Sequence, residues 1–126
     1  MTAVLVHGNP ETAAIWGPLL NALDREDVVA LSPPGFGAPV PDGWMATRAE
    51  YAAWLATKLE AMDEPVDLVG HDWGGGHVVA VAMARAVAEQ TGAAVSVLDG
   101  VGHWWMLQDP VAAASALNTF WTGLVR

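Results

Sequence analysis

The chain has 126 residues, 53% hydrophobic and 15% charged, with five Lys and Arg residues and a formal net charge of −9. This length and composition predict one domain over residues 1–126, and the scarcity of basic residues argues against a nucleic-acid or anionic-membrane partner. Cysteine is absent, which excludes disulfides and a thiolate nucleophile. No apolar run reaches the roughly 18 residues that span a bilayer, so we expect a cytoplasmic protein with no membrane partner.

The first part of the chain predicts a strand, a helix, a second strand and a long loop. Residues 3–6 form a short apolar run closed by His-Gly-Asn-Pro, which is typical of a buried strand that ends in a loop. Apolar residues at helical spacing over 15–23 predict a helix, and residues 28–31 predict the next strand. Residues 32–43 are rich in proline and glycine, so we expect an irregular loop there.

Helices and strands continue to alternate in the second part of the chain. Thr47 and Glu50 form a capping-box signal at the start of the next predicted helix. Val111 is expected on the buried face of the last helix, and the acidic residues near Asp27 and Glu64 are expected in solvated loops. The predicted elements are, in order, a helix over 47–62, a strand over 66–69, a helix over 74–91, a strand over 94–98 and a helix from 110 onward.

This alternation predicts an α/β fold with three αβα layers and a four-stranded parallel sheet of order 2-1-3-4. In such a sheet, ligands bind beyond the carboxyl ends of the strands where the strand order reverses, here between the first and third strands. The loops that carry Asn9 and Asp72 follow these two strands, so we expect them to be neighbours. Strands 28–31 and 94–98 carry almost no charge at the sheet edges, which predicts a homo-oligomer.

The segment 69–76 places Asp72 between an apolar strand and a helix, with Gly70 and Gly74 two positions on either side. This is the layout of a nucleophile elbow, where a carboxylate attacks an electrophilic carbon and forms an ester with the enzyme. Here the chain resembles the α/β-hydrolase family, in particular its Asp-nucleophile branch of haloalkane dehalogenases and epoxide hydrolases. The resemblance implies a hydrolase acting on a small-molecule substrate, an alkyl halide, an epoxide or an activated ester, and we expect no cofactor.

The resemblance also assigns roles to three further residues. Asn9 and Trp73 match the residues that hold the leaving halide, and both side chains offer uncharged N–H donors. His103, in a glycine-containing loop, matches the histidine that activates the water for hydrolysis of the ester on Asp72. The alternative interpretation is that Asn9 makes a turn, Trp73 packs on the core and His103 is a capping or surface group.

The remaining histidines and the loop tryptophans have weaker assignments. His7 and His71 are expected to order their loops by hydrogen bonding, and His77 is expected to be packed or exposed within its helix. His71, Trp104 and Trp105 lie at the site end of the predicted sheet and are candidates for lining a pocket. The spacing of the histidines matches no known metal-ligand set.

The interval between Asp72 and His103 departs from the family pattern, because in the family it holds a cap domain and the acid that orients the histidine. Asp99 and Asp109 are the nearby candidates for that acid, and we hypothesise that Asp99 accepts a hydrogen bond from His103. The sequence therefore predicts a truncated α/β-hydrolase core. The rival interpretation is a non-catalytic small-molecule binding module or a trimmed hydrolase scaffold with little or no activity.

Overall fold

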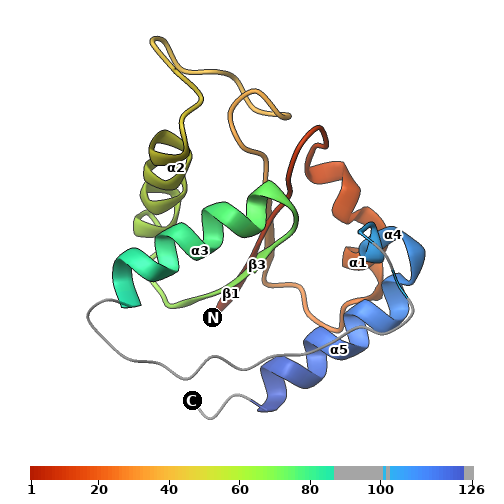
Figure 1. Ribbon diagram of the computed structural model, residues 1–126. Helices are drawn as coiled ribbons and strands as arrows, with labels where there is room; N and C mark the ends of the chain where they lie inside the picture. Colours follow the sequence, from red (N-terminus) through yellow and green to blue (C-terminus); the bar gives the residue numbers. More distant parts are fainter. Residues whose placement is uncertain (87–100, 102, 124–126) are drawn as a thin grey trace.

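A parallel β-sheet organises the computed structural model, which describes residues 1–86, 101 and 103–123 (Figure 1). From β1 to α3 the helices and strands alternate in the predicted order. They are β1 Thr2–Val6, the 3-10 helix η1 Ala13–Trp16, α1 Gly17–Ala22, β2 Val28–Leu31, α2 Arg48–Glu60, β3 Val66–Gly70, α3 Trp73–Ala86, α4 Trp105–Gln108 and α5 Pro110–Gly123.

The described sheet has three parallel strands in the order β2-β1-β3, with Val4 of β1 opposite Val29 of β2 and Leu68 of β3. These three strands therefore lie in the predicted relative order. The predicted fourth strand, over 94–98, lies outside the described residues. Within the described sheet β2 is an edge strand, and the predicted homo-oligomer stays a prediction.

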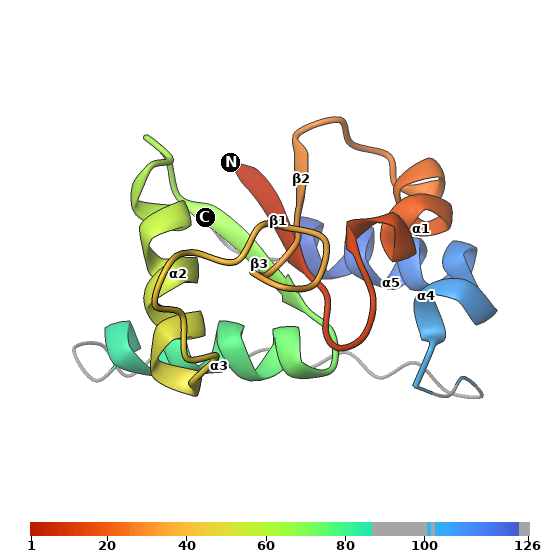
Figure 2. The same ribbon diagram turned by 90° about the horizontal axis from the view of Figure 1, so that it is seen from above.

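Helices cover both faces of the sheet, as Figures 1 and 2 show, so the three-layer prediction is confirmed for the described elements. Side chains of β1 point alternately to opposite faces. Ala3 and Leu5 pack with residues of η1, α1, α4 and α5, whereas Val4 and Val6 pack with residues of α2 and α3. Ala3 to Val6 are fully buried, so β1 lies at the centre of the molecule and delivers the loop that follows it to the end of the sheet.

Local sequence signals explain the helix boundaries well. The predicted capping box is present, because Thr47 Oγ1 accepts from the backbone N–H of Glu50 and Glu50 Oε2 accepts from the backbone N–H of Thr47. The predicted first helix is divided into η1 and α1, since Pro18 has no N–H to donate and lies at the start of α1. The short helix α4 was not predicted, because four residues give no readable period.

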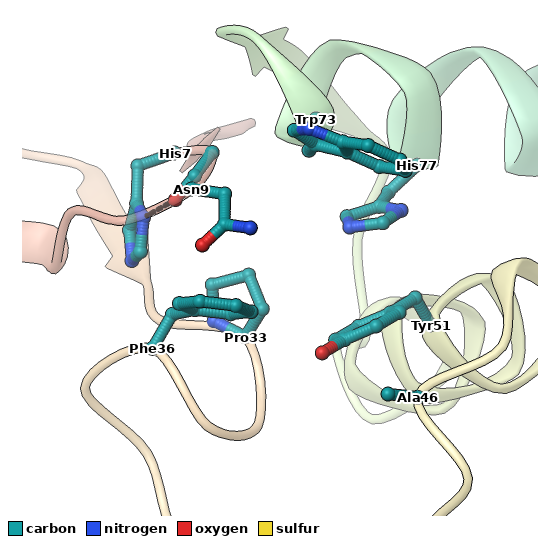
Figure 3. A pocket seen from close by; sticks show the side chains of 9 residues that line it. His7, Asn9, Pro33, Phe36, Ala46, Tyr51, Trp73 and His77 are labelled. Atoms are coloured by element: carbon teal, nitrogen blue, oxygen red, sulfur yellow. Dashed lines mark hydrogen bonds between the residues drawn. The ribbon is translucent and has the colours of Figure 1, made fainter.

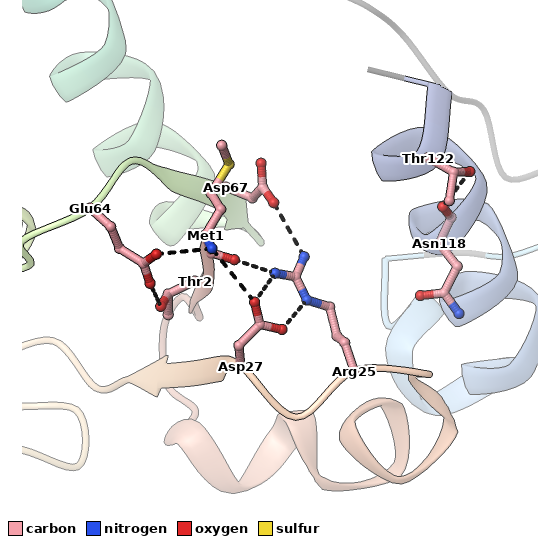
Figure 4. A network of polar contacts seen from close by, with 8 residues as sticks. All are labelled: Met1, Thr2, Arg25, Asp27, Glu64, Asp67, Asn118 and Thr122. Atoms are coloured by element: carbon pink, nitrogen blue, oxygen red, sulfur yellow. Dashed lines mark hydrogen bonds and ion pairs between the residues drawn. The ribbon is translucent and has the colours of Figure 1, made fainter. Parts of the chain in front are cut away.

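One expectation about burial is wrong. Val111 is 69% exposed, because Ala113, Ala114 and Trp121 form the buried side of α5. Asp27 and Glu64 are exposed loop residues, as predicted, and in addition they belong to a polar network, in which Glu64 accepts a hydrogen bond from Thr2 (Figure 4).

Arg25 is the centre of this network. Its guanidinium donates to both oxygens of Asp27 at 2.7 Å, to Asp67 at 3.2 Å and to the carbonyl of Met1 at 2.6 Å, and it lies 4.5 Å from the ring centre of Trp121. The hydrogen bonds from Arg25 lower the pKa of Asp27 to about 2. Figure 4 shows the polar contacts around Arg25, which join the starts of the three strands at the end of the sheet opposite Asp72. The contact between Arg25 and Trp121 links this network to α5.

Candidate active site

Asp72 lies between the end of β3 and the start of α3, with a backbone φ of 54°. This left-handed conformation is strained for a residue with a side chain, and such strain is found at functional sites. The flanking glycines make the turn possible. A Cβ on Gly70 would lie 2.6 Å from the Cα of Gly75, and a Cβ on Gly74 would overlap the carbonyl oxygens of Val6 and His7. The predicted elbow geometry is therefore present at Asp72.

The Asp72 carboxylate has a different partner at each oxygen. The backbone N–H of Asn9 donates to Oδ2 at 3.1 Å, and Nε2 of His103 lies 3.6 Å from Oδ1. Gly8 packs so closely against this carboxyl that a Cβ there would overlap it. Burial acts to raise the pKa of Asp72, but hydrogen bonds from the backbone of Trp73 and Asn9 and the charges of His103 and His71 lower it on balance. Asp72 is therefore held as a carboxylate.

The completely buried side chain of His7 holds the loop after β1 in place by hydrogen bonds. Its Nδ1 donates to the carbonyl of Gly8 at 2.7 Å, which leaves Nε2 to accept from the hydroxyl of Ser32 at 3.2 Å. The Ser32 oxygen also accepts from the backbone N–H of Ala13. The prediction that His7 orders its loop is confirmed, and the contacts place the N–H of Asn9 beside Asp72.

His103 reaches Asp72 from a turn that precedes α4, and its side chain is 53% exposed. His71 holds this turn, because its Nε2 donates to the carbonyl of His103 at 2.6 Å and the two rings lie 4.5 Å apart. Trp104 and Trp105 pack against the ring of His71. His71 thus makes a hydrogen bond as predicted, but the bond holds the turn that carries His103 rather than the loop of His71 itself.

The acid that would orient His103 is not found among residues 1–86, 101 and 103–123, where Nδ1 of His103 has no hydrogen-bond acceptor. Asp99, the residue of our hypothesis, lies outside the described residues. Asp109 instead caps α5, where its Oδ1 accepts from the backbone N–H of Ala112 at 2.9 Å.

A pocket of about 180 Å³ opens beside the elbow (Figure 3). Its walls come from the loop after β1, the loop after β2, the first turns of α3 and the start of α2. They are formed by His7, Gly8, Asn9, Pro33, Phe36, Ala46, Tyr51, Trp73 and His77.

Of the predicted site residues, Asn9 and Trp73 line this pocket, and Trp73 is 57% exposed rather than packed in the core. His71, Trp104 and Trp105 do not contribute to its wall and surround His103 instead, so their role as pocket residues stays a prediction. Phe36, Tyr51 and His77 were missed as pocket residues. For His77 a signal was available, because it follows Trp73 by four positions and therefore lies on the same side of α3.

Two further observations on the described residues concern metal binding and membrane spanning. Among the described residues, no group of three or more His, Asp or Glu side chains is arranged to hold a metal ion. Every helix in that part of the chain is too short or too polar to cross a membrane.

Comparison with known families agrees with the fold and the elbow. The model of the alpha/beta hydrolase family matches residues 3–88, and the chain belongs to this family. The matched segment contains the loop with Asn9 and the elbow with Asp72, whereas His103 follows it. No curated protein and no solved structure matches the chain.

Proposed function

We propose that this protein is a hydrolase of the Asp-nucleophile branch of the family, similar to haloalkane dehalogenases and epoxide hydrolases. The observation that carries the proposal is Asp72 itself, a carboxylate at the tip of the elbow with φ 54° and a hydrogen bond from the loop after β1. Its lowered pKa supports a nucleophilic role, since an ionised carboxylate has the electron pair that attack on carbon requires.

In the first step Oδ1 of Asp72 attacks an electrophilic carbon of the substrate. A carbon–oxygen bond forms, the bond to the halide or other leaving group breaks, and the leaving group keeps the electron pair. The amide of Asn9 and the indole N–H of Trp73 stabilise the charge that develops on the leaving group. Both side chains line the same pocket, which supports this assignment (Figure 3).

In the second step His103 accepts a proton from water, and the resulting hydroxide attacks the ester carbon of Asp72. The negative charge then gathers on Oδ2, the oxygen that faces the backbone N–H of Asn9. This donor, together with the backbone N–H of Trp73, serves as an oxyanion hole for the intermediate. Collapse of the intermediate releases the alcohol, which takes the proton from His103, and leaves Asp72 as the carboxylic acid, which loses its proton to solvent to regenerate the carboxylate.

The substrate is a small molecule, either an alkyl halide, an epoxide or an activated ester. Asp99 completes the site in this proposal as the carboxylate that holds the tautomer of His103. We also propose that residues 1–126 act as a single domain and that copies of it associate through a sheet edge. The rival function, a non-catalytic binding module or scaffold, is retained as an outcome of the test.

The test compares hydrolysis of a short alkyl bromide, an epoxide and an activated ester in the parent and two variants. Asp72→Asn should lower turnover by roughly a thousandfold or more, because the amide is a poor nucleophile. His103→Gln should allow the ester on Asp72 to accumulate, which intact mass spectrometry detects as an adduct.

Asp63→Asn is the matched control, since it removes an exposed carboxylate outside the site and should leave turnover unchanged. The proposal fails if Asp72→Asn keeps the parent's turnover. The rival function is supported if the folded parent hydrolyses none of the three substrates.

A further inference from the structure

His77 is a buried imidazole that the proposed chemistry does not use. It lies on α3 one turn after Trp73, is 7% exposed and stacks on the ring of Tyr51 with centres 4.7 Å apart and planes at 17°. Its nitrogens make no hydrogen bond with any described residue, yet the side chain lines the pocket beside the elbow. A ligand in the pocket can therefore supply the hydrogen bond that the described part of the protein does not.

The other polar side chains of the pocket differ from His77 in their hydrogen-bond partners or in their position. The hydroxyl of Tyr51 donates to the carbonyl of Pro34 at 3.1 Å, and both ring nitrogens of His7 are engaged beneath the loop. The amide of Asn9 extends into the pocket from the wall opposite His77 (Figure 3). The pocket therefore offers Asn9 at one side, His77 at the other and apolar or aromatic surface between them.

The charge of these groups limits the ligand to an uncharged one. Burial lowers the pKa of His77, so the ring is neutral near pH 7 and carries one N–H donor and one nitrogen acceptor. Among the described residues no Lys or Arg lines the pocket, and the Asp72 carboxylate contacts the same Gly8 that forms part of its wall. A hydroxyl or carbonyl group satisfies a neutral imidazole, whereas a carboxylate has no cation to neutralise it here.

The size of the pocket limits the length of the ligand. Its volume is about 180 Å³, below the roughly 300–1,000 Å³ of typical ligand pockets. A short ligand chain therefore suits it better than a large ligand. Gly8, Asn9 and Trp73 border both the pocket and the Asp72 carboxyl, so one end of such a chain lies beside the nucleophile.

We propose that His77 is a substrate-binding residue, and that the pocket takes short uncharged substrates with an electrophilic carbon at one end and a hydroxyl or carbonyl group at the other. The electrophilic end lies against Asp72 and Asn9, and the polar end hydrogen-bonds to His77. Tyr51 fixes the imidazole plane by stacking. The assignment of the reactive end rests on the proposed function, whereas the hydrogen bond to His77 does not.

The experiment uses two bromides of equal length, 3-bromopropan-1-ol and 1-bromobutane, which differ in a hydroxyl against a methyl group. We expect the parent to prefer the bromo-alcohol in kcat/KM, and His77→Phe, which keeps an aromatic ring over Tyr51, to reduce that preference by about tenfold. His77→Gln restores a hydrogen-bonding group and should recover part of it. Val79→Ala, a change at an exposed position of the same helix, is the matched control and should keep the parent's preference.

A binding measurement separates this inference from the hydrolytic function. In the Asp72→Asn variant neither bromide reacts, and the imidazole resonances of His77 are assigned by their loss in the His77→Phe background. A saturable shift of these resonances with 3-bromopropan-1-ol, larger than that with 1-bromobutane, supports the inference even if no hydrolysis is ever detected. Equal shifts for the two bromides, or no shift with the bromo-alcohol, overturn it while leaving the role of Asp72 open to its own test.

Discussion

The two halves of the proposed catalytic pair are held in different ways. Asp72 is positioned by backbone, because Gly70 and Gly74 allow β3, α3 and β1 to meet around it and the N–H of Asn9 fixes one carboxylate oxygen. His103 is positioned by contacts from other parts of the chain. Its ring is 53% exposed, and its turn is anchored by one hydrogen bond from His71.

Because of this difference, we expect the conformation around Asp72 to be harder to displace than the conformation around His103. A conformation fixed by close backbone packing cannot shift without disturbing the sheet, so changes there affect folding as well as chemistry. A side chain in a turn held by one hydrogen bond can be displaced while the fold survives. We therefore expect changes near Asp72 to reduce stability, and changes near His103 to reduce turnover alone.

The largest effect is expected from Gly74→Ala. The added methyl group would overlap the backbone carbonyls of Val6 and His7, and neither can move without shifting β1. We expect a loss of about 3 kcal/mol or more in the free energy of unfolding, measured by urea denaturation.

Gly76→Ala is the matched control, because the same change two positions later meets no atom within 4 Å. It should stabilise the helix by up to about 1 kcal/mol. Similar stabilities for the two variants would show that the elbow is not held by backbone packing.

An intermediate effect is expected from His71→Phe, which keeps an aromatic ring but removes the N–H that holds the carbonyl of His103. Stability should change by less than about 1 kcal/mol. Turnover should fall by about tenfold, because the base is then less well placed over the ester. Rapid-mixing mass spectrometry should show slower breakdown of the ester on Asp72, with its formation unchanged.

His71→Gln is the companion variant, since its amide can donate to the same carbonyl and should recover part of the turnover. If His71→Phe stays within twofold of the parent in turnover, the hydrogen bond to the His103 turn does not position the base.

The smallest effect concerns pH and tests the burial of His77, which lies beside the Asp72 half of the site. Burial lowers the pKa of His77 below the value near 6.5 that an unfolded chain shows. Below about pH 6.5 the unfolded state therefore binds a proton that the folded state resists, so stability falls as the pH is lowered through this window. The urea midpoint of the parent should decrease between pH 8 and pH 5, and that of His77→Phe should decrease less.

Val79→Ala is the control for this series, because it changes an exposed position of the same helix without removing a titratable group and should keep the parent's decrease. An equal decrease in the parent and in His77→Phe would contradict the burial of a neutral His77.

Structural features that depend on a few adjacent residues could be predicted from the sequence. The strand over 28–31, the capping box at Thr47 and the elbow at Asp72 each depend on a few adjacent residues, and all three are present. The relative order of the first three strands also follows from general rules for parallel sheets.

Features set by residues distant in the sequence could not be predicted. The pocket wall at Phe36 and Tyr51 depends on how the loop after β2 folds onto α2. The network around Arg25 depends on three strand starts meeting at one end of the sheet (Figure 4). Such positions follow from packing over long sequence separations, which periodicity and local propensity do not encode.

The central claim is that Asp72 attacks carbon and is not a base for direct attack by water. A single turnover in water enriched in oxygen-18, with enzyme in excess over a short alkyl bromide, tests it directly, because hydrolysis of an ester on Asp72 leaves a water oxygen in the carboxylate. We predict a gain of about 2 Da, the mass difference between the two oxygen isotopes, in the peptide that contains Asp72, with no label in the alcohol. Label in the alcohol and none in the Asp72 peptide would contradict the account.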